Sequence, residues 1–165
     1  MGAELLTIGT ELLLGQIVDT NASWMSQRLA EAGIDVYYKS TVGDNWGRIE
    51  AAIRLAMSRA DVIIMTGGLG PTEDDLTRDV LAAVLGRPLR PDAAILEHIQ
   101  ERFATRRVPM PENNRKQAMV PDGALVLHNP RGTAPGLLIR EAGRVFVCMP
   151  GVPSEMKPML LEQVI

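Results

Sequence analysis

Three glycines and three acidic residues share one short segment of this chain. The segment runs Thr66-Gly67-Gly68-Leu69-Gly70-Pro71-Thr72-Glu73-Asp74-Asp75-Leu76-Thr77. Glycines let backbone N–H groups approach a ligand closely, and a helix N-terminus adds partial positive charge, so the glycine half suits a phosphate. The carboxylates would repel a polyphosphate unless a divalent cation bridged the two, and Mg²⁺ prefers carboxylate and phosphate oxygens. The segment therefore predicts a phosphate site with Mg²⁺ or a similar cation.

Helix capping is the simpler explanation of the acidic residues. Thr72 and Asp75 have the spacing of a capping box, and acids in a first helical turn stabilise a helix by about 0.3–1 kcal/mol each. Capping accounts for one or two acids, but it does not account for the glycines beside them. We therefore favour a ligand site and keep capping as the alternative.

The hydrophobic pattern around this segment predicts the elements that position it. Residues 61–66 form a short apolar, β-branched run typical of a buried parallel strand, and apolar residues recur at helical spacing from Leu76 up to Gly86. Earlier in the chain the same alternation predicts strands at residues 4–8 and 34–41, each followed by a helix. Strands separated by helices imply right-handed crossovers and a parallel sheet covered on both faces.

The second half of the chain is less regular. Its pattern predicts a helix around residues 95–103, a surface loop at 109–114, strands at 124–127, 136–139 and 144–149, and a helix at 153–165. The last two strands are joined by a hairpin-like turn, so we expect an antiparallel edge. The predicted fold class is α/β, a three-layer α/β/α sandwich with a mostly parallel, mixed sheet. The final helix ends without a cap, which predicts that residues 1–165 form one domain of a longer protein.

Composition and charge further restrict the class of protein and its possible partners. The chain has 165 residues, 46% of them hydrophobic, which suffices for one domain with a sizeable core. A net charge of −3 without a basic stripe argues against direct nucleic-acid binding. No apolar run reaches about 18 residues, so no membrane partner is expected. The single cysteine, Cys148, lies in an apolar run and is predicted to be a core residue, which suits the cytoplasm.

The carboxyl ends of the parallel strands are the expected site. Ligands of open parallel sheets bind there, where the turns at residues 9–21, 41–45 and 66–77 should meet. We predict Glu11, Asp44 and Asp75 as catalytic residues facing one cleft, and Asp44, Asp74 and Asp75 as metal ligands, because gathered carboxylates are costly without a cation. An Asx turn and helix cap explain Asp44-Asn45 equally well.

Two later glycine-proline turns, at residues 129–136 and 149–155, are also candidates for the cleft. Taken singly, each is more often a plain turn. His98 and His128 lack the partner spacing of a zinc site or a catalytic triad. Walker A is absent and the third glycine of a dinucleotide fingerprint is missing, so a standard Rossmann site is disfavoured.

Several ordered motifs resemble the N-terminal domain of the CinA family, the competence/damage-inducible proteins. They are Gly9-Thr10-Glu11-Leu12-Leu13-x-Gly15, Val42-Gly43-Asp44-Asn45, the glycine and acid segment, Asn114-Arg115-Lys116-Gln117-Ala118, Gly132-Thr133-Ala134-Pro135-Gly136 and Pro150-Gly151-Val152-Pro153-x-Glu155. The wider superfamily that this resemblance implies is the molybdopterin-binding MogA/MoaB/MoeA fold.

The resemblance implies a function. In CinA-like proteins this domain is associated with metal-dependent hydrolysis of ADP-ribose to AMP and ribose 5-phosphate. In the molybdopterin enzymes, aspartates at the places of Asp44 and Asp75 serve a Mg²⁺-assisted adenylyl transfer. CinA-like proteins often continue into a nicotinamide mononucleotide deamidase domain, which these 165 residues do not encode. Fold relatives often self-associate, so a homo-oligomer is a further expectation.

We therefore predict a metal-dependent nucleotide pyrophosphatase domain acting on ADP-ribose. Glu11 or Glu155 would act as general base or bind a sugar hydroxyl, and Lys116 or Arg115 would complete a phosphate clamp unless they only lie on a surface loop. The predicted phosphate and nucleotide contacts are Thr66, Gly67, Gly68, Gly70, Pro71, Thr72, Thr77, Lys116, Gly132, Thr133, Gly151 and Glu155. Two alternatives remain: a molybdopterin-binding or adenylyl-transfer protein of molybdenum-cofactor synthesis, and a non-catalytic module that senses a nucleotide or pterin.

Overall fold

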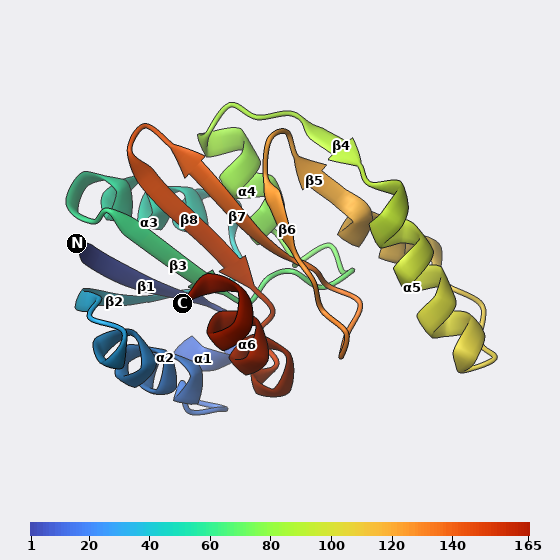
Figure 1. Cartoon of the computed structure of the whole chain (residues 1–165), viewed down its shortest axis with the longest axis horizontal. Helices are drawn as coiled ribbons and strands as arrows, with labels where there is room; N and C mark the ends of the chain where they lie inside the picture. Colours follow the sequence, from blue (N-terminus) through green and yellow to red (C-terminus); the bar gives the residue numbers. More distant parts are fainter.

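A six-stranded sheet runs through the centre of the computed structural model, which describes all residues from 1 to 165 (Figure 1). Its order is β2-β1-β3-β8-β7-β6. The strands are β1 (Gly2–Ile8), β2 (Asp35–Val42), β3 (Val62–Thr66), β6 (Leu125–Leu127), β7 (Gly136–Glu141) and β8 (Arg144–Met149). β2, β1, β3 and β8 are parallel, whereas β7 and β6 add an antiparallel edge. The predicted mixed, mostly parallel sheet is confirmed.

Helices cover both faces of this sheet (Figure 1). Alternate strand residues point to opposite faces, so Leu5 and Ile64 pack in one core, while Leu6 and Ile63 pack in the other. The first core is covered by α2 (Thr20–Glu31) and α6 (Pro153–Met159), and the second by α3 (Trp46–Arg59) and α4 (Thr77–Val84). This is the predicted three-layer sandwich. None of the helices has both the length and the apolar character needed to cross a bilayer.

A two-stranded antiparallel ribbon lies outside the main sheet. It is formed by β4 (Leu89–Pro91) and β5 (Met119–Pro121), with α5 (Ala93–Thr105) and the 3-10 helix η1 (Glu112–Ala118) between them in the chain. In Figure 1 this unit extends away from the sheet, with α5 at its outer edge. The ribbon was not predicted, because three-residue strands are too short to show a periodicity.

Four local predictions need correction. The turn at residues 9–21 is not one long loop, because it contains α1 (Thr10–Leu13) and the first residues of α2. The surface loop at 109–114 ends early, because Asn114 is buried in η1 and donates to the side chain of Gln117 over 2.9 Å. The last helix changes after Met159 into a π-helix, η2 (Leu160–Val164). Finally, the helix expected from Leu76 begins at Thr77.

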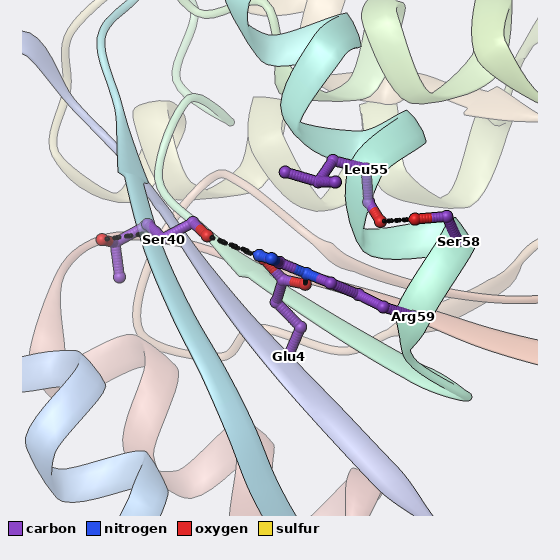
Figure 2. Close-up of polar contacts among 6 residues, drawn as sticks. Glu4, Ser40, Leu55, Ser58 and Arg59 are labelled. Carbon is purple, nitrogen blue, oxygen red and sulfur yellow. Dashed lines mark hydrogen bonds and ion pairs between the residues drawn. The ribbon is translucent and has the colours of Figure 1, made fainter.

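A largely buried ion pair ties α3 to the sheet (Figure 2). The guanidinium of Arg59, in the last turn of α3, donates to both carboxylate oxygens of Glu4 on β1 over 2.8 Å each. Ser40 on β2 donates to the same carboxylate over 2.7 Å, and the Arg59 guanidinium lies 3.9 Å from the ring centroid of Tyr38. Burial alone would raise the pKa of Glu4, but the hydrogen bonds from Arg59 and Ser40 and the Arg59 charge lower it.

Candidate functional site

A cleft of about 650 Å³ lies at the carboxyl ends of β1, β2 and β3, which is a volume typical of small-molecule sites. The strand register aligns these ends, because Ile8 pairs with Val42 and Thr7 pairs with Thr66. The predicted site residues that line the cleft are Glu11, Asp44, Thr66, Gly67, Gly68, Gly70, Pro71, Thr72, Asp74, Asp75, Thr133, Gly151 and Glu155. The prediction that the three turns share one cleft is confirmed. Thr77, Lys116 and Gly132 are not part of this lining.

Two positions in the glycine turn strongly favour glycine. Gly67 and Gly68 have φ angles of 98° and 68°, which favour glycine. A β-carbon would lie 2.1 Å from the Ile8 carbonyl oxygen at Gly67, and 2.1 Å from the Thr77 hydroxyl at Gly68. Thr77 is buried, and its hydroxyl donates to the Gly67 carbonyl over 2.8 Å. Thr77 thus supports the turn from behind.

The turn presents unpaired donors. The backbone N–H groups of Gly68, Leu69 and Gly70 donate to no acceptor in the protein. The Leu69 carbonyl accepts from Gln117 over 3.3 Å and from Arg78 over 3.4 Å. In a trans peptide the carbonyl and the following N–H point in opposite directions, so the Gly70 N–H is directed away from Gln117 and Arg78. Unpaired N–H groups in one cleft-lining turn are suited to binding an anion.

The acidic part of the turn is closed by hydrogen bonds between Thr72 and Asp75. One carboxylate oxygen of Asp75 accepts from the Thr72 N–H over 2.9 Å and from the Thr72 hydroxyl over 2.7 Å. Lys116 on η1 donates to the carbonyls of Thr72 and Asp75. Because α4 begins only at Thr77 and Leu76 is its N-cap, the interpretation of Thr72 and Asp75 as the capping box of this helix is wrong. They close a turn before it.

Asp44 is tied to the first turn of the chain. Its carboxylate accepts from the Thr10 N–H, and its own N–H donates to the Thr10 hydroxyl, over 3.0 Å each. The neighbouring Asn45 accepts from the Arg48 N–H and is the N-cap of α3. Helix capping therefore belongs to Asn45, and Asp44 fixes the start of α1, which carries the exposed Glu11 into the cleft.

Glu155 at the start of α6 also lines the cleft. Its carboxylate accepts from the buried Asn129 over 2.8 Å, and Asn129 also accepts from the N–H of Gly132 over 3.1 Å. A β-carbon at Gly132 would lie 2.3 Å from the Glu155 carboxylate. Because Gly132 has no side chain, the Glu155 carboxylate can lie close to its backbone, although Gly132 itself does not line the cleft. The His98 Nε2 lies 3.1 Å from the Asn129 carbonyl oxygen.

Sequence reasoning missed five polar side chains of the lining, namely Thr7, Asp19, Thr20, Asn21 and Gln117. Asp19 and Asn21 lie in the first of the turns that were predicted to meet, so the strand-end rule already pointed to them. Asp19 caps α2, and Asn21 donates to the Gly151 carbonyl over 2.7 Å. Gln117 stands in the motif at residues 114–118, but its position relative to the cleft could not be predicted, because only the folding of η1 brings it to the glycine turn.

The comparisons with known proteins agree with this architecture. Residues 4–165 match the family model described as "Probable molybdopterin binding domain". The chain therefore belongs to this family of molybdopterin-binding domains. The Thermus thermophilus protein described as the molybdopterin biosynthesis enzyme MoaB shares its fold, with a TM-score of 0.63 at 20% identity over 96% of this chain and 86% of that one.

Nearer relatives place the chain among the CinA proteins, which confirms the resemblance seen in the sequence. The crystal structure of CinA from Thermoplasma acidophilum superposes with a TM-score of 0.90 at 34% identity, covering 97% of this chain and 94% of that one. A "putative competence-damage inducible protein" from Caldicellulosiruptor bescii is 52% identical over 165 residues. The match covers all of this chain but 40% of that relative, so the chain spans less than half of its length.

Proposed function

We propose that the cleft binds a phosphorylated nucleotide or pterin and, with a divalent cation, carries out chemistry at its phosphate. The observation that supports this most directly is the row of unpaired N–H groups at Gly68, Leu69 and Gly70, at the carboxyl end of a central parallel strand. These donors would hold phosphate oxygens and stabilise charge that develops on them. The positive φ angles of Gly67 and Gly68 set the conformation of the turn that carries these donors.

The acidic residues fit a cation that is shared with the ligand. No group of three or more His, Cys, Asp or Glu side chains is gathered for a metal ion, so the protein offers no complete cage. Asp44 and Asp75 line the cleft, and each keeps one carboxylate oxygen that accepts no hydrogen bond. Mg²⁺ typically takes one or two carboxylates and completes its shell with waters and substrate phosphates. When bound there, it would neutralise phosphate charge.

Of the other carboxylates that line the cleft, Glu11 and Glu155 are our candidates for proton transfer. Glu11 is exposed at the start of α1, and Glu155 is half-buried with one oxygen bound to Asn129. A general base must lie within hydrogen-bond reach of the proton that it removes. Glu11 has no hydrogen-bond partner that would restrain its carboxylate, so we assign it the role of base, and we assign Glu155 the role of orienting the ligand.

Two reactions suit this site. The first is hydrolysis of a nucleoside diphosphate sugar, and the resemblance to CinA proteins makes ADP-ribose our first candidate substrate. Membership of the molybdopterin-binding family favours the second, in which the same site binds molybdopterin and serves adenylyl transfer. Both need a polyphosphate next to the glycine turn. They differ in the group that attacks a phosphorus atom. In the hydrolysis, water attacks the diphosphate of ADP-ribose and yields AMP and ribose 5-phosphate, whereas in the transfer the molybdopterin phosphate attacks ATP, takes its adenylyl group and releases pyrophosphate.

The test is to incubate the purified protein with ADP-ribose, and in parallel with molybdopterin and ATP, each with Mg²⁺ or with chelator. Release of AMP and ribose 5-phosphate that requires Mg²⁺ would support the hydrolase. Formation of adenylylated molybdopterin would support the transferase. Binding of either ligand without turnover would indicate a sensing module, and failure to bind any of them would refute the proposal.

A further inference from the structure

Arg78 is a completely buried arginine without a salt bridge. Its side chain is 0% exposed, and none of the ion pairs in the structure includes it. Its Nη2 donates to the Leu69 carbonyl over 3.4 Å, its Nη1 donates to the Lys116 carbonyl over 3.3 Å, and its buried Nε has no acceptor. Both hydrogen bonds are longer than the usual range of about 2.7–3.2 Å. The guanidinium, with its several N–H donors, is therefore poorly satisfied here.

The surroundings of Arg78 make its charge costly. Burial lowers the pKa of Arg78, against the attraction of Asp79, Cys148 and Asp75, yet arginine stays protonated in proteins. Its place in the first turn of α4 also opposes the helix dipole, which favours anions at that end. A buried charge is retained at such cost when it is paired. Asp75 and Asp79 attract Arg78, but neither carboxylate lies within ion-pair distance of its guanidinium.

The glycine turn separates Arg78 from the cleft. Leu69, whose carbonyl Arg78 holds, lines the cleft, and its neighbours carry the unpaired N–H groups. An anion bound by those N–H groups would lie across one layer of backbone from the guanidinium. Charges interact strongly through a protein interior because the effective dielectric constant there is low.

We propose that Arg78 is a positioning residue for phosphate binding, which fixes the Leu69 carbonyl and supplies the buried positive charge that a ligand phosphate neutralises. This rests on the proposed function of the cleft. A purely structural Arg78 would instead serve to join the turn to η1. The two roles differ in what happens when the charge is removed.

The test compares Arg78→Met, which removes the charge and both contacts, with Arg78→Gln, which removes the charge but keeps an amide donor for the Leu69 carbonyl. Arg87→Met is the matched control, because it removes one positive charge from an ion pair with Glu141 that lies outside the cleft. For each protein, the Kd for ADP and for adenosine is measured by calorimetry with Mg²⁺, and the melting temperature is measured without ligand.

We expect both Arg78 variants to raise the Kd for ADP by about tenfold or more, to leave the Kd for adenosine within about threefold, and to keep or raise the melting temperature. The control should change neither Kd. If wild type binds ADP and both Arg78 variants bind it equally well, the role of Arg78 is overturned and the proposed function stands. If Arg78→Met unfolds, Arg78→Gln decides by the same criterion. If wild type fails to bind ADP, the role of Arg78 in nucleotide phosphate binding is overturned, whereas the proposed function falls only if ADP-ribose, ATP and molybdopterin also fail to bind.

Discussion

Asp75 binds Thr72 twice through a single carboxylate oxygen, once at the backbone N–H and once at the hydroxyl. The Asp75 N–H also donates to the Thr72 carbonyl over 3.2 Å, so the two residues close one tight turn at the wall of the cleft. The second carboxylate oxygen accepts no hydrogen bond. One carboxylate oxygen of Asp75 therefore holds the turn closed, and the other is available to bind a cation or a ligand.

Asp75→Asn separates these two roles. Asparagine keeps an acceptor for Thr72 and loses the negative charge, so a role in the turn alone predicts a stability loss of at most about 1 kcal/mol and a normal rate. A role in cation binding or transition-state stabilisation predicts a fall in kcat of about two orders of magnitude or more, equivalent to about 2.7 kcal/mol. Circular dichroism and the hydrolysis rate should be measured on one preparation. A hydrolysis rate within about threefold of wild type, with a native spectrum, would show that Asp75 serves only to hold the turn closed.

The shared cation predicts linked binding. A ligand that binds the native state raises the melting temperature by mass action, so ADP-ribose should stabilise the protein more with Mg²⁺ than with chelator. The measurement is a thermal shift over a series of ADP-ribose concentrations in both conditions, with Mg²⁺ alone as the control. Equal shifts with and without the metal would argue that phosphate binding needs no cation.

Substitution of glycine by alanine should lower the free energy of unfolding more at Gly68, in the glycine turn, than at Gly15. Gly68 and Gly15 have φ angles of 68° and 70°, but a β-carbon at Gly68 would overlap the Thr77 hydroxyl, whereas one at Gly15 meets nothing within 4 Å. Gly15→Ala should cost roughly 1–2 kcal/mol from the backbone alone. Gly68→Ala should cost roughly 1–3 kcal/mol more, because the methyl group must displace Thr77. Urea unfolding of both variants tests this, and equal losses would show that the turn moves aside freely.

The place of the site was predictable because it follows from one rule about parallel strands. β3 is apolar up to its last residue, and β1 is mostly apolar apart from Glu4 and Thr7. The residues that follow the parallel strands β1, β2 and β3 must meet at the same edge, which brings Glu11, Asp44 and the glycine turn together. Arg78 was not predictable, because it stands between Thr77 and Asp79 in a pattern typical of an exposed helix start. Its burial depends on η1, whose position depends in turn on a ribbon of three-residue strands. The interpretation of Thr72 as a helix cap was wrong for a similar reason. Lys116, which η1 brings to this turn, donates to the carbonyls of Thr72 and Asp75.

The ion pair between Glu4 and Arg59 predicts how stability depends on pH. The folded-state pKa of Glu4 lies below its ordinary value of 4.5, so the folded state holds the proton less tightly than the unfolded chain does. The stabilisation is therefore complete above about pH 5 and is lost as the pH falls through the folded-state pKa. Glu4→Gln removes the titrating group and keeps nearly the same volume.

We expect the difference in unfolding free energy between wild type and Glu4→Gln to be largest near neutral pH and to shrink as the pH is lowered below about 5, towards and through the lowered pKa of Glu4. The control is Glu50→Gln, which removes the exposed partner of Arg54 on the same helix, because an exposed pair of this kind contributes little and is screened by solvent. Urea unfolding at several pH values measures both differences. A Glu4→Gln difference that stays constant with pH would mean that the carboxylate titrates in the folded protein as it does in the unfolded chain, and that packing rather than charge accounts for the contribution of Glu4. A difference that grows as the pH falls would mean that burial raises the pKa of Glu4 above its unfolded value, which would contradict the prediction.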